Sequence, residues 1–191
     1  TMDTAADVAV TITGTLLSED IVALNAILTD GIVKATVKGS VEELADVTTA
    51  ATDAITFVIT GDNAEAADLK TLDDRTSATV NASAIKEITG SAADLKTIYA
   101  SKTISGLGNE AVTITDPTPF ASADDVNAIL KATTGKVTAE VAAGTAKSLN
   151  KDLKDAKATD ALTLTVNGTA ATAAELNALD GKTSVDVIVN T

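Results

Sequence analysis

Carboxylates are the side chains with the most capacity for chemistry in this sequence, because it contains neither histidine nor cysteine. That composition excludes disulfides, thiolate chemistry, histidine-type zinc sites and histidine general bases. An oxygen-rich Ca²⁺ site is still chemically possible, but no Asp-x-Asp-x-Asp-Gly loop occurs. We therefore interpret the aspartates as solvated groups at helix ends, with weak Ca²⁺ binding as an alternative and no metal ligand assigned. The aspartates that such binding could use are Asp73, Asp74, Asp152, Asp155, Asp160 and Asp180.

Adjacent carboxylates could act as acid and base in glycoside hydrolysis. Asp124-Asp125 and Glu42-Glu43 are such pairs, but neighbouring positions on a helix point about 100° apart. A hydrolase would therefore have to combine carboxylates from separate segments. We expect no catalytic residue and no enzymatic activity, and we keep a carboxylate-based hydrolase as the least favoured alternative.

Two short motifs suggest other chemistry. Gly106-x-Gly108-x-x-Ala111 has the outline of a dinucleotide-binding loop, but that fingerprint needs a helix directly after the glycines. A strand is expected at Ala111, so we predict a plain loop and no cofactor. Asn81-Ala-Ser83 and Asn167-Gly-Thr169 match the N-glycosylation triplet, and strand-to-helix turns explain both without a sugar.

Threonines recur at alternate positions of several segments and could form ladders on one sheet face. β-branched side chains suit any sheet, but a regular threonine lattice could also bind ice or a polysaccharide. Lys34, Glu140 and Asp186 interrupt the regularity. The threonines concerned are Thr11, Thr13, Thr56, Thr60, Thr113, Thr115, Thr163 and Thr165.

The composition favours a soluble protein whose core is built from small and branched side chains. The net charge of −13 would repel phosphate backbones and anionic lipid surfaces, so nucleic acid is not expected as a partner. No stretch approaches the ~20 apolar residues of a membrane helix, so membrane insertion is not expected. The aromatic residues are only Phe57, Tyr99 and Phe120, few for an enzyme with a substrate pocket.

Strand-like segments with period-two alternation recur along the chain. In each, aliphatic residues would face one way and mostly polar residues the other. The predicted strands cover residues 8–13, 55–60, 111–115, 137–141, 162–166 and 185–189, with weaker members at 32–37 and 78–82.

Most of these strands lead into a glycine, a hydroxyl or carboxyl side chain and then a short helix. Ser40-x-x-Glu43 and Thr172-x-x-Glu175 fit the capping box, and Ser91-x-x-Asp94 and Ser122-x-x-Asp125 are shorter versions. The predicted turns lie at Gly14-Thr15, Gly39-Ser40, Gly61-Asp62, Gly90-Ser91, Gly144-Thr145 and Gly168-Thr169. The helices are anchored by aliphatic pairs beginning at Leu24, Leu44, Leu69, Ile85, Leu95, Val126, Leu149 and Leu176.

Alternating strands and helices predict an α/β fold with parallel strands. Polar residues on every second strand position predict one hydrated sheet face, which favours a β/α solenoid with short helices on the other face. An ordinary α/β domain, or a sheet with some antiparallel pairing, is the alternative. We expect residues 1–191 to form a single solenoid-like domain, with a kink or sub-block boundary at 101–120, where both prolines lie.

Parts of the sequence resemble repeats in very large secreted or cell-surface proteins of marine cyanobacteria and related bacteria. The resemblance lies in SAADLKTIYAS (91–101), TGKVTA (134–139), AAELNALD (173–180) and above all ISGLGNEAVT (104–113). It implies an extracellular, structural or adhesive role and brings no catalytic residues. The chain would then be either an excised block or a small relative that assembles from subunits.

We therefore predict an extracellular surface-layer, fibre-forming or adhesin-type module that associates head to tail through its terminal strands. Solenoids have open ends with unpaired strand edges, and the segments Val8 to Thr13 and Val185 to Val189 would form those ends. The alternatives are a threonine-rich face that binds ice or a polysaccharide, and the hydrolase considered above.

Overall fold

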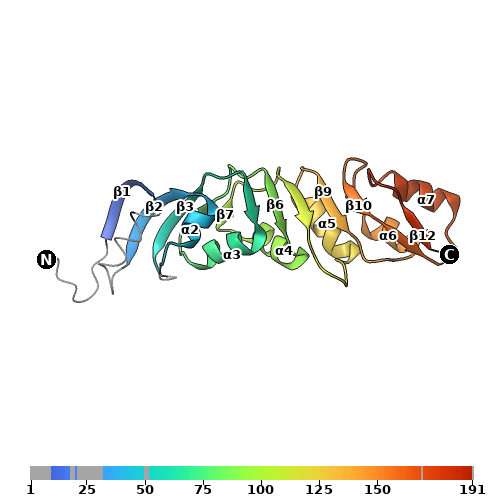
Figure 1. Ribbon diagram of the computed structural model, residues 1–191, viewed down its shortest axis with the longest axis horizontal. Helices are drawn as coiled ribbons and strands as arrows, with labels where there is room; N and C mark the ends of the chain where they lie inside the picture. The colour runs from blue at the N-terminus through green and yellow to red at the C-terminus, as the bar shows by residue number, and fades with distance from the viewer. Residues whose placement is uncertain (1–9, 18–19, 21–31, 50–51, 169, 191) are drawn as a thin grey trace. The chain divides into compact units, whose positions relative to one another are not determined.

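The computed structural model of the protein describes residues 10–17, 20, 32–49, 52–168 and 170–190 (Figure 1). The chain divides into two compact units. The first contains residues up to 85 together with 100–107, and the second contains 86–99 together with the residues from 108 onward.

The first unit contains a five-stranded sheet in which every pair given a register is parallel. Its strand order, β1-β2-β3-β5-β7, follows the chain. Phe57 of β3 lies between Val37 and Val80 of the neighbouring strands. The elements are β1 (Val10–Leu17), β2 (Val33–Gly39), α2 (Val41–Ala45), β3 (Ala54–Ile59), β4 (Asn63–Glu65), α3 (Ala66–Asp74), β5 (Val80–Asn81) and β7 (Ile104–Ser105).

The second unit repeats this arrangement of parallel strands in chain order. Strands β6, β8, β9 and β10 lie side by side, and β11 pairs with β12. The elements are β6 (Glu87–Gly90), α4 (Ala92–Ala100), β8 (Ala111–Ile114), α5 (Ala123–Ala132), β9 (Val137–Glu140), α6 (Ala146–Asp152), β10 (Ala161–Thr163), β11 (Thr165–Asn167), α7 (Ala173–Asp180) and β12 (Ile188–Asn190).

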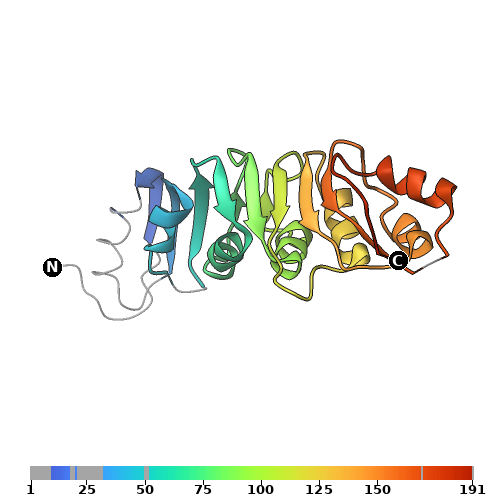
Figure 2. The same cartoon turned by 45° about the vertical axis from the view of Figure 1, so that its right-hand side comes forward.

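The expected α/β class with mainly parallel sheets is confirmed. Alternation also places the side chains as expected: Ile55, Phe57 and Ile59 are buried while Thr56 and Val58 are partly exposed. The same alternation runs through β8 and β9. Within each unit the helices lie along the buried side of the strands (Figures 1 and 2), so the apolar core fills the space between the strands and the helices.

Hydroxyl side chains begin the helices where the sequence predicted caps. Ser40 and Thr172 form complete capping boxes with Glu43 and Glu175. Thr145 also caps its helix, because its Oγ1 accepts the N–H of Ser148. These caps satisfy helix N–H groups that have no partner inside the helix.

Three local predictions are wrong. Ile85 belongs to no helix, because residues 82–86 form a turn that leads into β6. Gly61-Asp62 does not cap a helix, since β4 intervenes and α3 begins after Glu65 without a side-chain cap. Residues 185–189 do not form a strand with one buried face, because β12 begins only at Ile188 and its residues are exposed. A fourth wrong prediction is the turn at Gly14-Thr15, because β1 continues through both residues to Leu17. The predictions at Leu24 and residues 1–9 lie outside the described residues.

Candidate functional site

Three buried carboxylates occupy equivalent places in the fold. Asp53, Glu110 and Asp160 are 4%, 1% and 0% exposed, and each directly precedes a strand. They share the local sequence Thr/Asn-Asp/Glu-Ala-aliphatic-Thr, at residues 52–56, 109–113 and 159–163. This recurrence was the signal that could have identified them, and the sequence interpretation missed it.

Backbone N–H groups satisfy these carboxylates. Asp53 Oδ1 accepts the N–H of Val33 at 2.9 Å, and Asp160 Oδ1 accepts the N–H of Val137 at 2.9 Å. Glu110 Oε2 accepts the N–H of Gly108 at 2.8 Å. Carboxylates bound in this way stabilise the fold by charge-assisted hydrogen bonds, and their oxygens are already engaged by the backbone.

A buried threonine follows each carboxylate at a separation of 23 residues. Thr76 Oγ1 donates to the carbonyl of Asp53 at 3.2 Å and is 2.6 Å from that of Ile55. Thr133 Oγ1 donates to the carbonyl of Glu110 at 2.7 Å, and Thr183 Oγ1 is 3.4 Å from that of Asp160. Each acid and threonine therefore link one strand segment to the next.

Tyr99 is the side chain whose ionisation the fold perturbs most. Its hydroxyl donates to Glu110 Oε1. Burial raises the pKa of the Tyr99 phenol far above its ordinary value, and the hydrogen bond to the Glu110 carboxylate raises it further. Tyr99 is thus held as a neutral donor, and together with the N–H groups of Gly108 and Asn109 it encloses the carboxylate.

The glycine motif forms a loop, as predicted. Gly106 and Gly108 adopt left-handed φ angles of 88° and 124°, and β8 begins at Ala111. A pyrophosphate would therefore meet no helix N-terminus after these glycines. An added Cβ on Gly106 would lie 2.6 Å from the backbone N of Ser83, which explains the glycine by close packing.

The aspartates proposed as weak Ca²⁺ ligands do not converge on one another. Each has a separate environment. Two pair with lysines, since Asp74 contacts Lys70 and Asp152 Oδ1 lies 3.7 Å from Lys151 Nζ. The others accept a hydrogen bond from Ser101 (Asp73), from Asn127 (Asp155) or from backbone N–H groups (Asp160), or are exposed (Asp180). Within the described part of the chain, no group of three or more acidic side chains could hold a metal ion.

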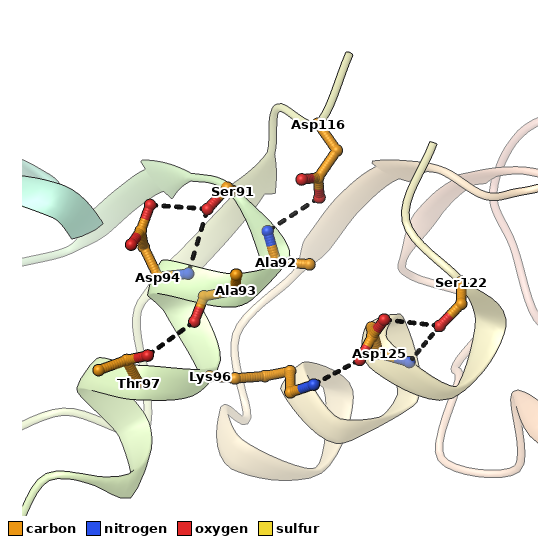
Figure 3. Close-up of polar contacts among 9 residues, drawn as sticks. All are labelled: Ser91, Ala92, Ala93, Asp94, Lys96, Thr97, Asp116, Ser122 and Asp125. Atoms are coloured by element: carbon orange, nitrogen blue, oxygen red, sulfur yellow. Dashed lines mark hydrogen bonds and ion pairs between the residues drawn. The ribbon is translucent and has the colours of Figure 1, made fainter. Parts of the chain in front are cut away.

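An open depression of about 350 Å³ lies between α4 and α5 and contains two carboxylates, Asp116 and Asp125. Asp116 Oδ2 accepts the N–H of Ala92 at 2.8 Å, at the start of α4 (Figure 3). Phe120, which is 38% exposed, and Pro119 also line the depression. Because two carboxylates line this depression, the hydrolase alternative can be tested against their geometry.

Asp125 is poorly suited to donate a proton there. Its carboxylate accepts the ammonium of Lys96 at 2.5 Å and the hydroxyl of Ser122 at 2.7 Å (Figure 3). These bonds, with that of Lys96 the stronger, lower the pKa of Asp125. A glycosidase acid needs the opposite shift. The adjacent Asp124 is exposed.

Threonines form in-register rows on two sheets. Thr15, Thr36 and Thr56 are paired across β1, β2 and β3, and Thr89, Thr113 and Thr138 are paired across β6, β8 and β9. Of these, Thr36, Thr56, Thr89, Thr113 and Thr138 are half-buried. Of the threonines predicted to form ladders, Thr56 and Thr113 lie in these rows, and the other members, Thr15, Thr36, Thr89 and Thr138, had not been singled out. Thr11, Thr163 and Thr165 pair instead with Lys34, Glu140 and Ile188.

Exposed apolar side chains lie on β12 of the second unit and just before it. Val185, Ile188 and Val189 are 39%, 47% and 42% exposed. At β1 of the first unit, Leu17 is 56% exposed. Because β1 and β12 are the outermost strands of their sheets, each has an unpaired edge in the described structure, and these edges are the candidate interaction surfaces.

The comparisons with known proteins give no relative from which the role of this geometry could be inferred. No family model matches the sequence, and neither the curated proteins nor the solved structures contain a match. Among the helices of the described residues, none has the length and apolar character needed to cross a membrane.

Proposed function

We propose that the chain is a structural module, built as an α/β solenoid, that acts by association and not by catalysis. The support comes from strand order, because the strands of each sheet lie in chain order and every registered pair is parallel. The recurring links between acid and threonine join successive strand segments. Such an arrangement is stabilised mainly by contacts between neighbouring segments.

The exposed apolar strand β12 is the observation that carries the associating role. Natural sheets usually protect an outer strand with charge, proline or a covering element. Here Ile188 and Val189 are exposed on the outer strand, with no charged residue between Ile188 and Asn190. Head-to-tail association would cover these side chains and would generate a ring or a filament.

We place this module outside the cell or on its surface. This placement rests on the resemblance to repeats of giant secreted proteins that we infer from the sequence of residues 91–101 and 104–113. The net charge of −13 suits a protein that must remain soluble as it accumulates. The proposed role includes surface-layer, fibre-forming and adhesin-type modules.

Sedimentation velocity over a wide range of protein concentrations tests the association directly. We expect oligomers that grow with concentration, and filaments or sheets in negative-stain electron micrographs. Repeating the measurement with Ca²⁺ and with a chelator separates a metal-dependent assembly from one formed by strand edges alone. A monomer at every concentration in both conditions would overturn the proposal.

A second candidate function uses the threonine rows. The row Thr89, Thr113 and Thr138 could contact a regular surface such as ice or a crystalline polysaccharide. Neighbouring β-strands place such side chains about 4.8 Å apart. Pull-down on insoluble polysaccharides and an ice-recrystallisation assay test this candidate, with Thr113→Lys as the blocking variant and Thr97→Lys on the exposed surface of α4 as the control. Binding that Thr113→Lys leaves unchanged would count against it.

A further inference from the structure

We propose that the edge of β12, together with Asn177 on α7, is one half of a joint whose other half is the edge of β1 in a second copy of this chain. The inference rests on the proposed associating function and names the surfaces that make it. Contacts between neighbouring segments inside the second unit provide the template for this joint.

Inside the second unit, Asn127 of α5 and Asn150 of α6 each reach into the segment that follows their helix. Asn127 of α5 donates to Asp155 Oδ2 and accepts the N–H of Asp155, both at 2.9 Å. Asn150 of α6 donates to the carbonyl of Glu175 at 2.8 Å. These bonds cross from one helical segment to the segment that follows it, at separations of 28 and 25 residues.

Helix α7 also carries an asparagine, Asn177, but this side chain is exposed. Asn177 of α7 stands in Leu-Asn-Ala-Leu, as Asn127 stands in Val-Asn-Ala-Ile. Asn127 is 8% exposed, whereas Asn177 lies on the exposed surface. Helix α7 therefore presents the polar group that α5 and α6 use to bind a following segment.

Strand β12 presents the matching backbone groups. The N–H of Ile188 donates to the carbonyl of Leu164 at 2.9 Å. Because successive N–H groups of a strand point to opposite edges, the N–H of Val189 points to the open edge. Asn177 and this edge thus complete a surface of the kind that is buried between segments elsewhere in the unit.

Strand β1 of a second copy is the occupant that continues this pattern. Among the described residues it pairs with β2 alone, and all registered strand pairs in both units are parallel. Stacking β1 beside β12 keeps the same parallel sense and covers Leu17, the most exposed large apolar residue. A contact between two β12 edges would instead need a symmetric joint, which the internal template does not offer.

The charge of the protein predicts how the joint responds to salt. Two copies that each carry a net charge of −13 repel one another, and salt screens that repulsion. The joint itself consists of apolar contacts and backbone hydrogen bonds, which screening does not weaken. Association should therefore increase with NaCl concentration, whereas a joint made of complementary charges would weaken.

Two variants block opposite halves of the joint. Ile188→Lys places an ammonium in the β12 edge, and Leu17→Lys does the same at β1. Each should reduce self-association by about tenfold or more, because an unpaired charge would have to be buried. Phe120→Lys is the matched control, since it also replaces an exposed apolar residue but lies on neither edge, and it should associate like the natural sequence.

Mixing the two blocked variants gives the decisive measurement. Each retains one intact half, so the mixture should form a heterodimer and nothing larger, observed by sedimentation with one variant fluorescently labelled. Formation of that heterodimer also shows that both variants are folded. Asn177→Ala should weaken the heterodimer when it is added to the Leu17→Lys chain.

The possible outcomes distinguish the joint from the broader function. If the natural sequence is monomeric at every concentration, the associating function itself is wrong. If it assembles but Ile188→Lys assembles equally well, association occurs elsewhere and only the joint is wrong. If Ile188→Lys blocks assembly while Leu17→Lys does not, the joint is a symmetric contact between β12 edges and the head-to-tail inference is overturned.

Discussion

The carboxylate of Asp160 accepts the backbone N–H of Val137 at 2.9 Å from a fully buried position. The two residues lie 23 positions apart, so the bond joins β9 to the segment that precedes β10. Asp53 makes the same contact with Val33 in the first unit. A second N–H, from Lys157, reaches the other oxygen of Asp160 at 2.8 Å.

Asp160→Asn should therefore destabilise the protein substantially. Asparagine offers one acceptor oxygen where the carboxylate has two, and it leaves a buried N–H group or amide unsatisfied. We expect a loss of about 2 kcal/mol in the free energy of unfolding, measured by urea titration. Asp124→Asn, at an exposed site in α5, is the control and should change stability by less than about 0.5 kcal/mol. Equal losses in the free energy of unfolding for the two substitutions would show that the buried hydrogen bonds of Asp160 contribute no more to stability than the exposed Asp124 carboxylate.

Tyr99 should remain protonated for as long as the protein stays folded in alkali. Its pKa is raised above the ordinary 10.0 first by burial and then by its hydrogen bond to Glu110. A raised folded-state pKa means that this contribution to stability is complete below pH 10 and is lost as the pH rises above it. Because Tyr99 is the only tyrosine, ultraviolet absorbance of tyrosinate should appear together with unfolding measured by circular dichroism.

Tyr99→Phe isolates this effect from the general increase in negative charge at high pH. It removes the donor to Glu110, so it should cost about 1 kcal/mol at neutral pH. The difference in stability from the natural sequence should shrink as the pH rises past 10.0. Tyrosinate that forms near pH 10 in a protein with native circular dichroism would contradict the partly buried, hydrogen-bonded state of this phenol.

Much of the fold could be predicted from local sequence, because its periodicity reflects burial directly. Ile55, Phe57 and Ile59 alternate with more polar positions and are buried in β3 as expected. Ser40 and Thr172 were recognisable as caps because their bonds reach only three residues along the chain. These interactions are local, so their sequence patterns are complete within a short window.

The buried carboxylates could not be identified in the same way, because their partners lie far along the chain. Asp160 was interpreted as a solvated group or weak Ca²⁺ ligand, yet its partner Val137 precedes it by 23 residues. The exposure of Ile188 and Val189 was equally hidden. Their aliphatic types predict burial, yet both side chains are exposed on a strand that has one neighbour in its sheet.

The ion pair between Lys96 and Asp125 should make a small contribution that acid removes. Hydrogen bonds from Lys96 and then from Ser122 lower the pKa of Asp125. A lowered folded-state pKa contributes stability above the ordinary pKa of 3.8, and this contribution is lost as the pH falls through the folded-state value. Because the carboxylate side chain is 39% exposed, we expect no more than about 1 kcal/mol.

Comparing Asp125→Asn with the natural sequence over a range of acidic pH measures this term. The gap between their unfolding free energies should be largest near neutrality and should close well below pH 3.8. Lys96→Met removes the partner of Asp125. In a chain that already carries Lys96→Met, adding Asp125→Asn should therefore change the free energy of unfolding much less. A gap that stays constant with pH would show that the carboxylate acts by packing and not by its charge.

Gly106 should be the glycine least tolerant of a side chain among those with left-handed backbone. Its φ is 88°, and an added Cβ would lie 2.6 Å from the backbone N of Ser83. Gly168 has a similar φ of 103°, but nothing lies within 4 Å of the corresponding Cβ. Gly168→Ala thus measures the cost of the backbone conformation alone, about 1 kcal/mol. Gly106→Ala adds a backbone clash that cannot relax by a rotamer change, so its loss in unfolding free energy should exceed that of Gly168→Ala by about 1 to 3 kcal/mol. Urea titration of both variants gives the comparison, and equal losses would mean that the backbone at Ser83 can move away without cost.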